Sequence, residues 1–218
     1  MLDFDGTILD TEESLYRVWA ELWDEHGHDL ALADWQQNIG SDDTFNPWTE
    51  LELRLGRTLD PALQDVRRQR RDEMQLELEP RPGITGWLNA AHALGLPVGV
   101  ASSSPINWVE GHLSRLGLRH QFSCLVCADD DIPAKPSPIS YVAVCEQLDA
   151  DPARSVAVED SPHGVAAAVA AGLFVVAVPH GLTSGLDFSQ ADLVVASLGD
   201  LTFTEVLEAA TARSRPLQ

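Results

Sequence analysis

Lysine is nearly absent from this sequence of 218 residues: of its 14 basic side chains only Lys135 is a lysine, and the rest are arginines. Basic residues are also few against 34 acidic ones, which gives a formal net charge of −20. Such a chain lacks the basic surface that attracts nucleic acids and anionic membranes. We therefore expect neither as a partner, and an anionic substrate would need a local cation or a metal ion.

Cysteine and long apolar runs are scarce as well. The 3 cysteines are an odd number and follow no signal-peptide pattern, which favours a reducing compartment, so we expect a cytoplasmic protein. The longest apolar stretch, residues 165–178, is shorter than the roughly 18 residues of a membrane-spanning helix. The hydrophobic share of 44% suffices for a globular core, and we expect a monomer.

From Pro97 onward, short β-branched segments alternate with segments of helical spacing. The β-branched segments are almost continuously apolar, as strands buried on both faces are. This alternation predicts an α/β fold with a doubly wound, Rossmann-like parallel sheet, in which ligands bind beyond the carboxyl ends of the strands. The predicted strands are Val98–Ala101, Cys124–Ala128, Ser155–Val158, Leu173–Val178 and Leu193–Val195.

The segment before this alternation has a different pattern. Leu15, Val18 and Leu22 recur at helical spacing, and no strand-like run follows them before residues 79–83, which contain two prolines and a glycine. A helical insertion that ends in a rigid linker fits this pattern. We predict a helical cap at 14–79, inserted into a Rossmann-like core made of 1–13 and 80–218.

Polar residues follow successive predicted strands. The first group places two carboxylates in a glycine-containing turn, and the backbone amides of this turn can bind an anion. Hydroxyls at the start of a helix suit a phosphate group, and paired acids suit Mg²⁺. Each group alone could be a helix cap or a turn, but together they indicate an active site. The groups are Asp3-Phe4-Asp5-Gly6-Thr7, Ser102-Ser103-Ser104-Pro105, Lys135-Pro136 and Glu159-Asp160-Ser161.

With these motifs in this order, the chain resembles the haloacid dehalogenase-like (HAD) superfamily. The similarity is to the branch with a helical cap, which includes β-phosphoglucomutases and small-metabolite phosphatases. It implies that Asp3 is the nucleophile and Asp5 the general acid and base, and that Lys135 neutralises the transferring phosphoryl group. The implied substrate-binding residues are Gly6, Thr7, Ser102, Ser103 and Lys135, and the implied Mg²⁺ ligands are Asp3, the Asp5 carbonyl, Glu159 and Asp160.

The resemblance predicts a Mg²⁺-dependent phosphoric monoester hydrolase that acts through an aspartyl-phosphate. The partner is a small phosphorylated metabolite, such as a sugar phosphate. Two alternatives remain: a phosphomutase like β-phosphoglucomutase, and a non-catalytic protein that binds a phosphorylated metabolite.

The cap sequence favours hydrolysis over the mutase reaction. β-Phosphoglucomutases, as the resemblance implies, carry a histidine early in the first cap helix and a Gly-x-Ser-Arg turn. The corresponding places here are Leu15 and Gly40-Ser41-Asp42-Asp43, whose acids would repel a second phosphate. A run of arginines is the remaining route to a mutase, should it face the site: Arg67, Arg68, Arg70 and Arg71.

The first strand is the one departure from the pattern. Only Met1 and Leu2 precede Asp3, whereas an ordinary strand has about five residues. We expect either a shortened first strand or a sequence that begins inside the complete protein.

Overall fold

The strands of the computed structural model, which describes residues 1–39, 45–128 and 131–213, are parallel throughout. β1 pairs with β2, β3 with β4 and β4 with β5, and Leu2 forms parallel bridges to Val100 of β1 and Val158 of β3. The predicted α/β fold with a parallel sheet is confirmed. The strands are β1 (Gly99–Ser102), β2 (Cys124–Cys127), β3 (Val156–Glu159), β4 (Phe174–Ala177) and β5 (Leu193–Val194).

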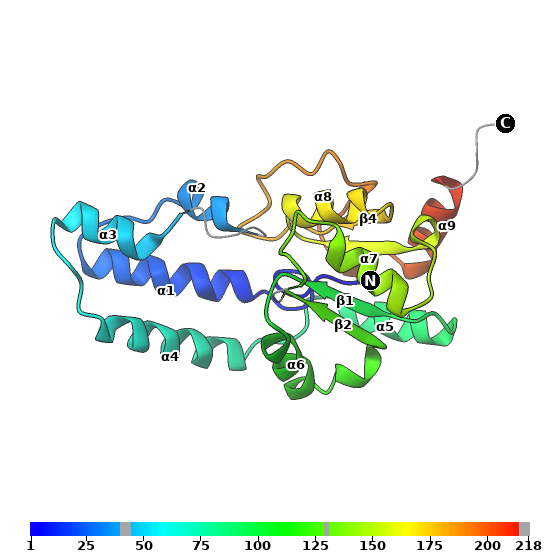
Figure 1. The fold of residues 1–218 in the computed structure, drawn as a ribbon, viewed down its shortest axis with the longest axis horizontal. Coiled ribbons are helices and arrows are strands. Elements are labelled where there is room, and N and C mark those ends of the chain that lie inside the picture. Colours follow the sequence, from blue (N-terminus) through cyan, green and yellow to red (C-terminus); the bar gives the residue numbers. More distant parts are fainter. Residues whose placement is uncertain (40–44, 129–130, 214–218) are drawn as a thin grey trace.

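Helices fill the segments between the strands and the region before them (Figure 1). The α-helices are α1 (Thr11–Glu25), α2 (Leu32–Trp35), α3 (Pro47–Leu55), α4 (Ala62–Leu76), α5 (Ile84–Ala93), α6 (Ile106–Arg115), α7 (Ile139–Gln147), α8 (Pro162–Ala170) and α9 (Phe203–Arg213). Short 3-10 helices are η1 (Gln36–Asn38), η2 (Arg119–Gln121), η3 (Pro152–Arg154) and η4 (Leu198–Asp200).

Two separate hydrophobic clusters cover the two faces of the sheet. In one cluster, residues of α5, α6 and α9 such as Leu88, Leu113 and Val206 are buried with sheet residues. The other contains residues of α7 and α8 such as Val144 and Val165. Helices on both faces are what defines a doubly wound sheet, and they explain why the strands are apolar on both sides.

The helices before the sheet have a hydrophobic cluster of their own. Trp19 and Trp23 of α1 and Leu51 of α3 are buried in it, and α1 also packs along α4. Figure 1 shows these helices extending to the left of the sheet. This third cluster agrees with a helical cap, although the boundaries at 14 and 79 stay a prediction.

Local sequence explains where the elements around the site begin and end. The Asp10 side chain caps α1 by accepting a hydrogen bond from the Glu13 amide at 3.4 Å. Ser161 caps α8 through the Gly164 amide at 3.0 Å. The proline-rich linker lies between the end of α4 and the start of α5, as expected from its composition.

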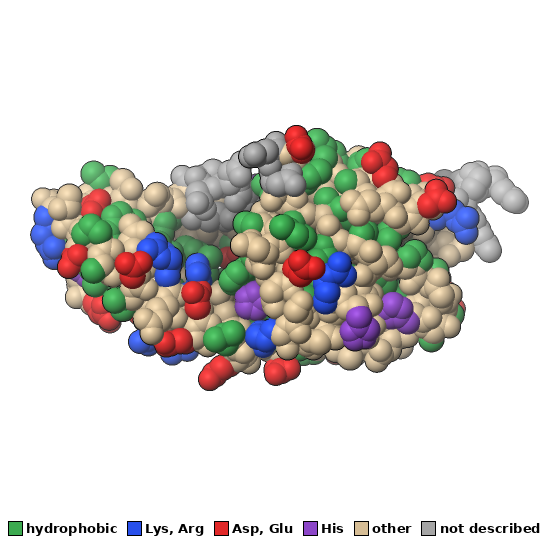
Figure 2. All heavy atoms as spheres, turned by 60° about the horizontal axis from the view of Figure 1, so that its bottom comes forward, with side chains coloured by type: hydrophobic (Ala, Val, Ile, Leu, Met, Phe, Trp, Pro, Cys, Tyr) green, Lys and Arg blue, Asp and Glu red, His purple; other side chains and the backbone are tan. Residues whose placement is uncertain are grey.

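Most of the arginine run on α4 faces acidic neighbours. Arg68 pairs with Asp65 on the same helix, and Arg70 Nε lies 2.7 Å from Glu21 Oε2 on α1. On the left half of the face in Figure 2, basic side chains lie beside acidic ones. These pairs are exposed, so each adds little stability.

In the part of the chain that the structure describes, none of the helices combines the length and hydrophobicity that crossing a membrane requires.

Candidate active site

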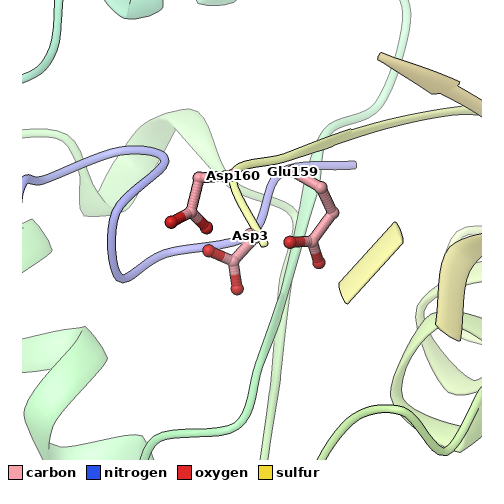
Figure 3. A group of neighbouring side chains, drawn as sticks. All are labelled: Asp3, Glu159 and Asp160. Atoms are coloured by element: carbon pink, nitrogen blue, oxygen red, sulfur yellow. The ribbon is translucent and has the colours of Figure 1, made fainter. Parts of the chain in front are cut away.

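Three carboxylates meet at the carboxyl end of the sheet (Figure 3). Asp3 follows the bridge residue Leu2, Glu159 ends β3, and Asp160 comes next. One oxygen from each carboxylate lies within 4.8 Å of the others, and all three side chains are buried. The three acids lie together because neighbouring parallel strands end at one edge of the sheet, and their roles stay a prediction.

Lys135 reaches into this group of acids. Its Nζ lies 2.5 Å from Asp3 Oδ1 and 2.6 Å from Glu159 Oε1, and the residue is only 3% exposed. Burial alone would lower the pKa of Lys135, but the charges and hydrogen bonds of Asp3 and Glu159 outweigh it and raise that pKa above its ordinary value. The only lysine of the sequence is therefore a buried cation between two carboxylates.

The acids outnumber the cations of the site. Burial raises the pKa of Asp3 well above its usual range although Lys135 opposes the shift, and burial also raises the pKa of Glu159. Asp3 Oδ2 and Glu159 Oε2 are buried without a hydrogen-bond partner among the described residues. Buried carboxylate oxygens without donors are costly, and a divalent cation would satisfy them. The donor set therefore fits Mg²⁺.

Gly6 and Thr7 pack against Asp160. The Thr7 hydroxyl donates to Asp160 Oδ1 at 3.3 Å. Gly6 has a φ of +83°, and a β-carbon there would lie 2.1 Å from Asp160 Oδ2. Only glycine fits this turn, since both the backbone angle and the space exclude a side chain. That Gly6 and Thr7 bind the substrate stays a prediction.

Asp5 lies apart from the three acids and is only partly buried. Its Oδ1 accepts hydrogen bonds from the Thr11 hydroxyl at 2.7 Å and the Trp108 indole at 2.9 Å, and its Oδ2 accepts one from the Ser104 hydroxyl at 2.6 Å. The Asp5 carboxylate is thus held by three neutral donors and lies outside the group of three acids. The predicted metal contact involves the Asp5 backbone carbonyl and remains a prediction.

The serines at the end of β1 and just after it form hydrogen bonds with other predicted site residues. Ser102 ends the strand, and its hydroxyl accepts a hydrogen bond from the Ser104 amide at 3.0 Å. The Ser103 hydroxyl accepts one from the Lys135 amide at 3.1 Å. The four sequence motifs therefore converge at one end of the sheet.

A cleft of about 380 Å³ opens beside Asp5, between the cap helices and the start of α6. Of the four arginines in the α4 run, Arg71 lines this cleft, whereas Arg67 stacks on Trp19 at 3.9 Å inside the cap. The lining residues are Asp5, Thr11, Glu12, Leu15, Arg71, Gln75, Ser104, Pro105, Asn107 and Trp108. The turn at Gly40-Ser41-Asp42-Asp43, weighed from the sequence, lies outside the described residues.

Sequence reasoning missed several side chains that touch the predicted site residues, among them Thr11, whose hydroxyl donates to Asp5. Tyr141 of α7 donates to Glu159 Oε1 at 2.6 Å, Trp108 of α6 donates to Asp5, and His180 lies 3.0 Å from Asp160. Tyr141 and Trp108 have no signal in the sequence beyond lying on predicted helices. His180 could have been found, because it follows β4 at the same edge of the sheet.

The fold and the acidic centre together define an α/β enzyme with its site at the end of a doubly wound sheet. The family profile "haloacid dehalogenase-like hydrolase" matches residues 1–172. The chain therefore belongs to the HAD-like hydrolases, as the motifs predict, and the predicted class of phosphoric monoester hydrolase is confirmed by relatives that are named phosphatases.

The relatives cover nearly the whole chain. The "putative phosphatase YhcW" of Bacillus subtilis is 39% identical over 95% of both chains. The fructose-1-phosphate phosphatase YqaB of Escherichia coli is 32% identical over 79% of this chain and 92% of its own. The crystal structure of β-phosphoglucomutase from Clostridium difficile has a TM-score of 0.70 at 22% identity, covers 97% of this chain and 96% of its own, and supports the fold alone.

Proposed function

We propose that this protein is a Mg²⁺-dependent phosphatase that hydrolyses a small sugar phosphate through an aspartyl-phosphate on Asp3. The observation that carries the proposal is the buried Asp3 carboxylate, which has Lys135 on one oxygen and no partner among the described residues on the other. One oxygen is held by a cation, and the other, which is buried, has no hydrogen bond among the described residues that would compete with a metal ion or with phosphorus.

Two carboxylates and one backbone carbonyl would hold the metal ion. Asp3, Asp160 and the Asp5 carbonyl are the proposed ligands, with Glu159 as a ligand or as a neighbour that orients them. A bound Mg²⁺ would neutralise charge on the phosphoryl oxygens and orient the group. Lys135 adds a positive charge that the chain itself supplies, and the serine hydroxyls and turn amides near Ser102 and Gly6 bind the remaining oxygens.

The first step transfers the phosphoryl group to the protein. A carboxylate oxygen of Asp3 attacks phosphorus, and the bond between phosphorus and the alcohol oxygen breaks. Asp5, in its acid form, donates a proton to the leaving oxygen. The position of Asp5 beside the cleft supports this role.

The second step returns Asp3 to its starting state. Asp5, now a carboxylate, accepts a proton from a water molecule whose oxygen attacks phosphorus. The bond between phosphorus and Asp3 breaks, and inorganic phosphate leaves. The same two carboxyl groups therefore serve both half-reactions, with Asp5 alternating between acid and base.

The relatives support a sugar phosphate as substrate. One of them is named a fructose-1-phosphate phosphatase, and the polar cleft residues Glu12, Asn107 and Arg71 suit a hydroxyl-rich group. The mutase alternative needs several cations for a second phosphate, and within the described cap only Arg71 of the α4 run lines the cleft. The observations therefore favour hydrolysis.

A screen of phosphorylated sugars with Mg²⁺ tests the proposal through the release of inorganic phosphate. We expect release by the wild-type protein, loss with EDTA, and recovery when Mg²⁺ is restored. Asp3→Asn removes the attacking charge with little change in volume, so it should abolish release while circular dichroism shows an unchanged fold. A folded Asp3→Asn variant with near wild-type turnover would overturn the proposed nucleophile.

A further inference from the structure

The loop after β4 contacts Asp160 through His180. The histidine is 8% exposed, and its Nε2 lies 3.0 Å from Asp160 Oδ2. Because a carboxylate only accepts hydrogen bonds, Nε2 carries the hydrogen in this contact. On its other side, Nδ1 lies 3.6 Å from Oδ1 of Asp10, the residue that caps the first cap helix.

Asp160 has little freedom to turn once this contact is made. Thr7 donates to its Oδ1, His180 holds its Oδ2, and Gly6 packs so closely that a β-carbon would collide with it. The carboxylate is therefore fixed from three directions by residues of two different loops. Of these neighbours, His180 alone lies outside the motifs predicted from the sequence.

The loop itself is held firmly to the core. The Thr183 hydroxyl accepts a hydrogen bond from the His180 amide at 2.9 Å, and the Thr183 amide donates to the His180 carbonyl at 2.9 Å. Arg81, in the linker that leaves the cap, donates to the carbonyl of Val178 at 3.2 Å and also to that of Gly6. Because Arg81 links the two segments, a displacement of this loop would also move the turn that contains Asp5 and Gly6.

The same loop also reaches the cap. Leu182 is 5% exposed and is buried in the cap cluster that includes Trp19 and Trp23. Its carbonyl accepts a hydrogen bond from Gln36 Nε2 at 2.7 Å. A single residue, Gly181, therefore separates the residue that contacts a proposed metal ligand from the residue that contacts the cap.

We infer that His180 is a positioning residue for Asp160, and that the loop 180–183 couples the place of the cap to the affinity of the site for a divalent cation. The inference rests on the proposed function, because it takes Asp160 as a metal ligand. Partners that orient a metal ligand change affinity without touching the metal, typically by about 10–100-fold. Packing of Leu182 in the cap then stabilises the same loop geometry that aims His180.

The test is the binding of Mn²⁺ to the metal-free full-length chain, measured by electron paramagnetic resonance. We expect His180→Ala to weaken Mn²⁺ binding by about 10–100-fold. His180→Gln should restore most of it, since a glutamine amide can reach the position of Nε2, whereas the shorter His180→Asn should not. Leu182→Ala should weaken binding in the same direction by a smaller factor.

His163→Ala is the matched control. This histidine also contacts the cap, through the Ile39 carbonyl at 3.1 Å, but it makes no hydrogen bond or ion pair with Asp160. Equal binding in His180→Ala and wild type, or an equal loss in His163→Ala, would overturn the inference. Absence of Mn²⁺ binding in the wild type would instead overturn the proposed metal site. If His180→Ala fails to fold by circular dichroism, the glutamine and asparagine variants decide the outcome.

Discussion

Asp3 and Asp5 are two positions apart, yet their surroundings differ sharply. Asp3 is buried against the Lys135 ammonium group, whereas Asp5 is partly exposed and accepts hydrogen bonds only from neutral groups such as Ser104. A carboxylate fixed by a cation is suited to attack, and one at the edge of a cleft is suited to exchange protons with alcohol and water.

This difference predicts the effect of Asp5→Asn. The variant keeps the size of the side chain and most of its hydrogen bonds but cannot transfer a proton, so kcat should fall by about 10²–10⁴-fold. Steady-state phosphate release measures it. Asp151→Asn, at an exposed cap of η3 where asparagine serves equally well, is the control and should keep wild-type kcat. An unchanged kcat in Asp5→Asn would contradict the assigned role.

The sequence shows some site residues better than others. The places of Asp3, Glu159 and Asp160 could be predicted because each lies at or just after the end of an apolar, strand-like segment. Lys135 lies further along the chain from β2, which ends at Cys127, and its being the only lysine singled it out. Trp108 could not be predicted, because it meets Asp5 across 103 residues and nothing in its neighbourhood distinguishes it from a core aromatic. Contacts of this kind depend on how whole helices pack, which no local pattern encodes.

At the scale of elements, the start of α8 determines how Glu159 lies. Gly164 stands in the first turn of this helix, and a β-carbon there would lie 1.9 Å from Glu159 Oε2. The fully buried Glu159 side chain therefore occupies the space that a side chain at position 164 would need. Close approach of helix and strand is what brings Glu159 within reach of Lys135.

Gly164→Ala should consequently disturb both stability and activity. Overpacking at a buried position typically costs about 1–3 kcal/mol, and here it would displace a side chain of the site. Urea unfolding and phosphate release measure the two effects. Gly111→Ala in α6, where a β-carbon meets nothing within 4 Å, is the matched control and should raise the free energy of unfolding by about 0.5–1 kcal/mol. Similar results for both variants would show that Gly164 is not constrained by Glu159.

Elements with a strong apolar pattern were predicted well, and weakly patterned ones were not. The predicted strand Leu173–Val178 contains the observed strand β4, Phe174–Ala177, because burial on both faces leaves a clear signal. The leucines of α3 are less regular: Leu51 is buried, but Leu53 is 72% exposed. In α4 the only buried residue is Gln75, so the helix has no row of apolar residues from which its buried face could be predicted.

At the scale of the whole molecule, charge limits what the protein can bind. The net charge of −20 repels phosphorylated compounds in general, and Lys135 with a bound cation would make the site a local exception. One arginine, Arg71, lines the cleft beside the site. Its guanidinium carbon lies 5.8 Å from the centre of the Trp108 ring. One cation suits a single phosphate and a neutral sugar better than a bisphosphate.

The choice between hydrolase and mutase follows from this balance. Incubation with β-glucose 1-phosphate, a bisphosphate primer and Mg²⁺ should release inorganic phosphate without forming glucose 6-phosphate, since of the arginines in the described cap only Arg71 lines the cleft. Nuclear magnetic resonance of phosphorus separates the products. Efficient formation of glucose 6-phosphate would identify a mutase instead.

The central claim, an aspartyl-phosphate on Asp3, is tested most directly by the stereochemical course at phosphorus. The measurement uses the phosphorothioate analogue of the best substrate from the screen, whose transferable group is made chiral by sulfur and two oxygen isotopes, and hydrolysis in water that carries the third oxygen isotope gives chiral thiophosphate. Each in-line displacement inverts the configuration, so transfer to Asp3 followed by transfer to water predicts overall retention. Overall inversion would mean that water attacks the substrate directly, and it would contradict the account.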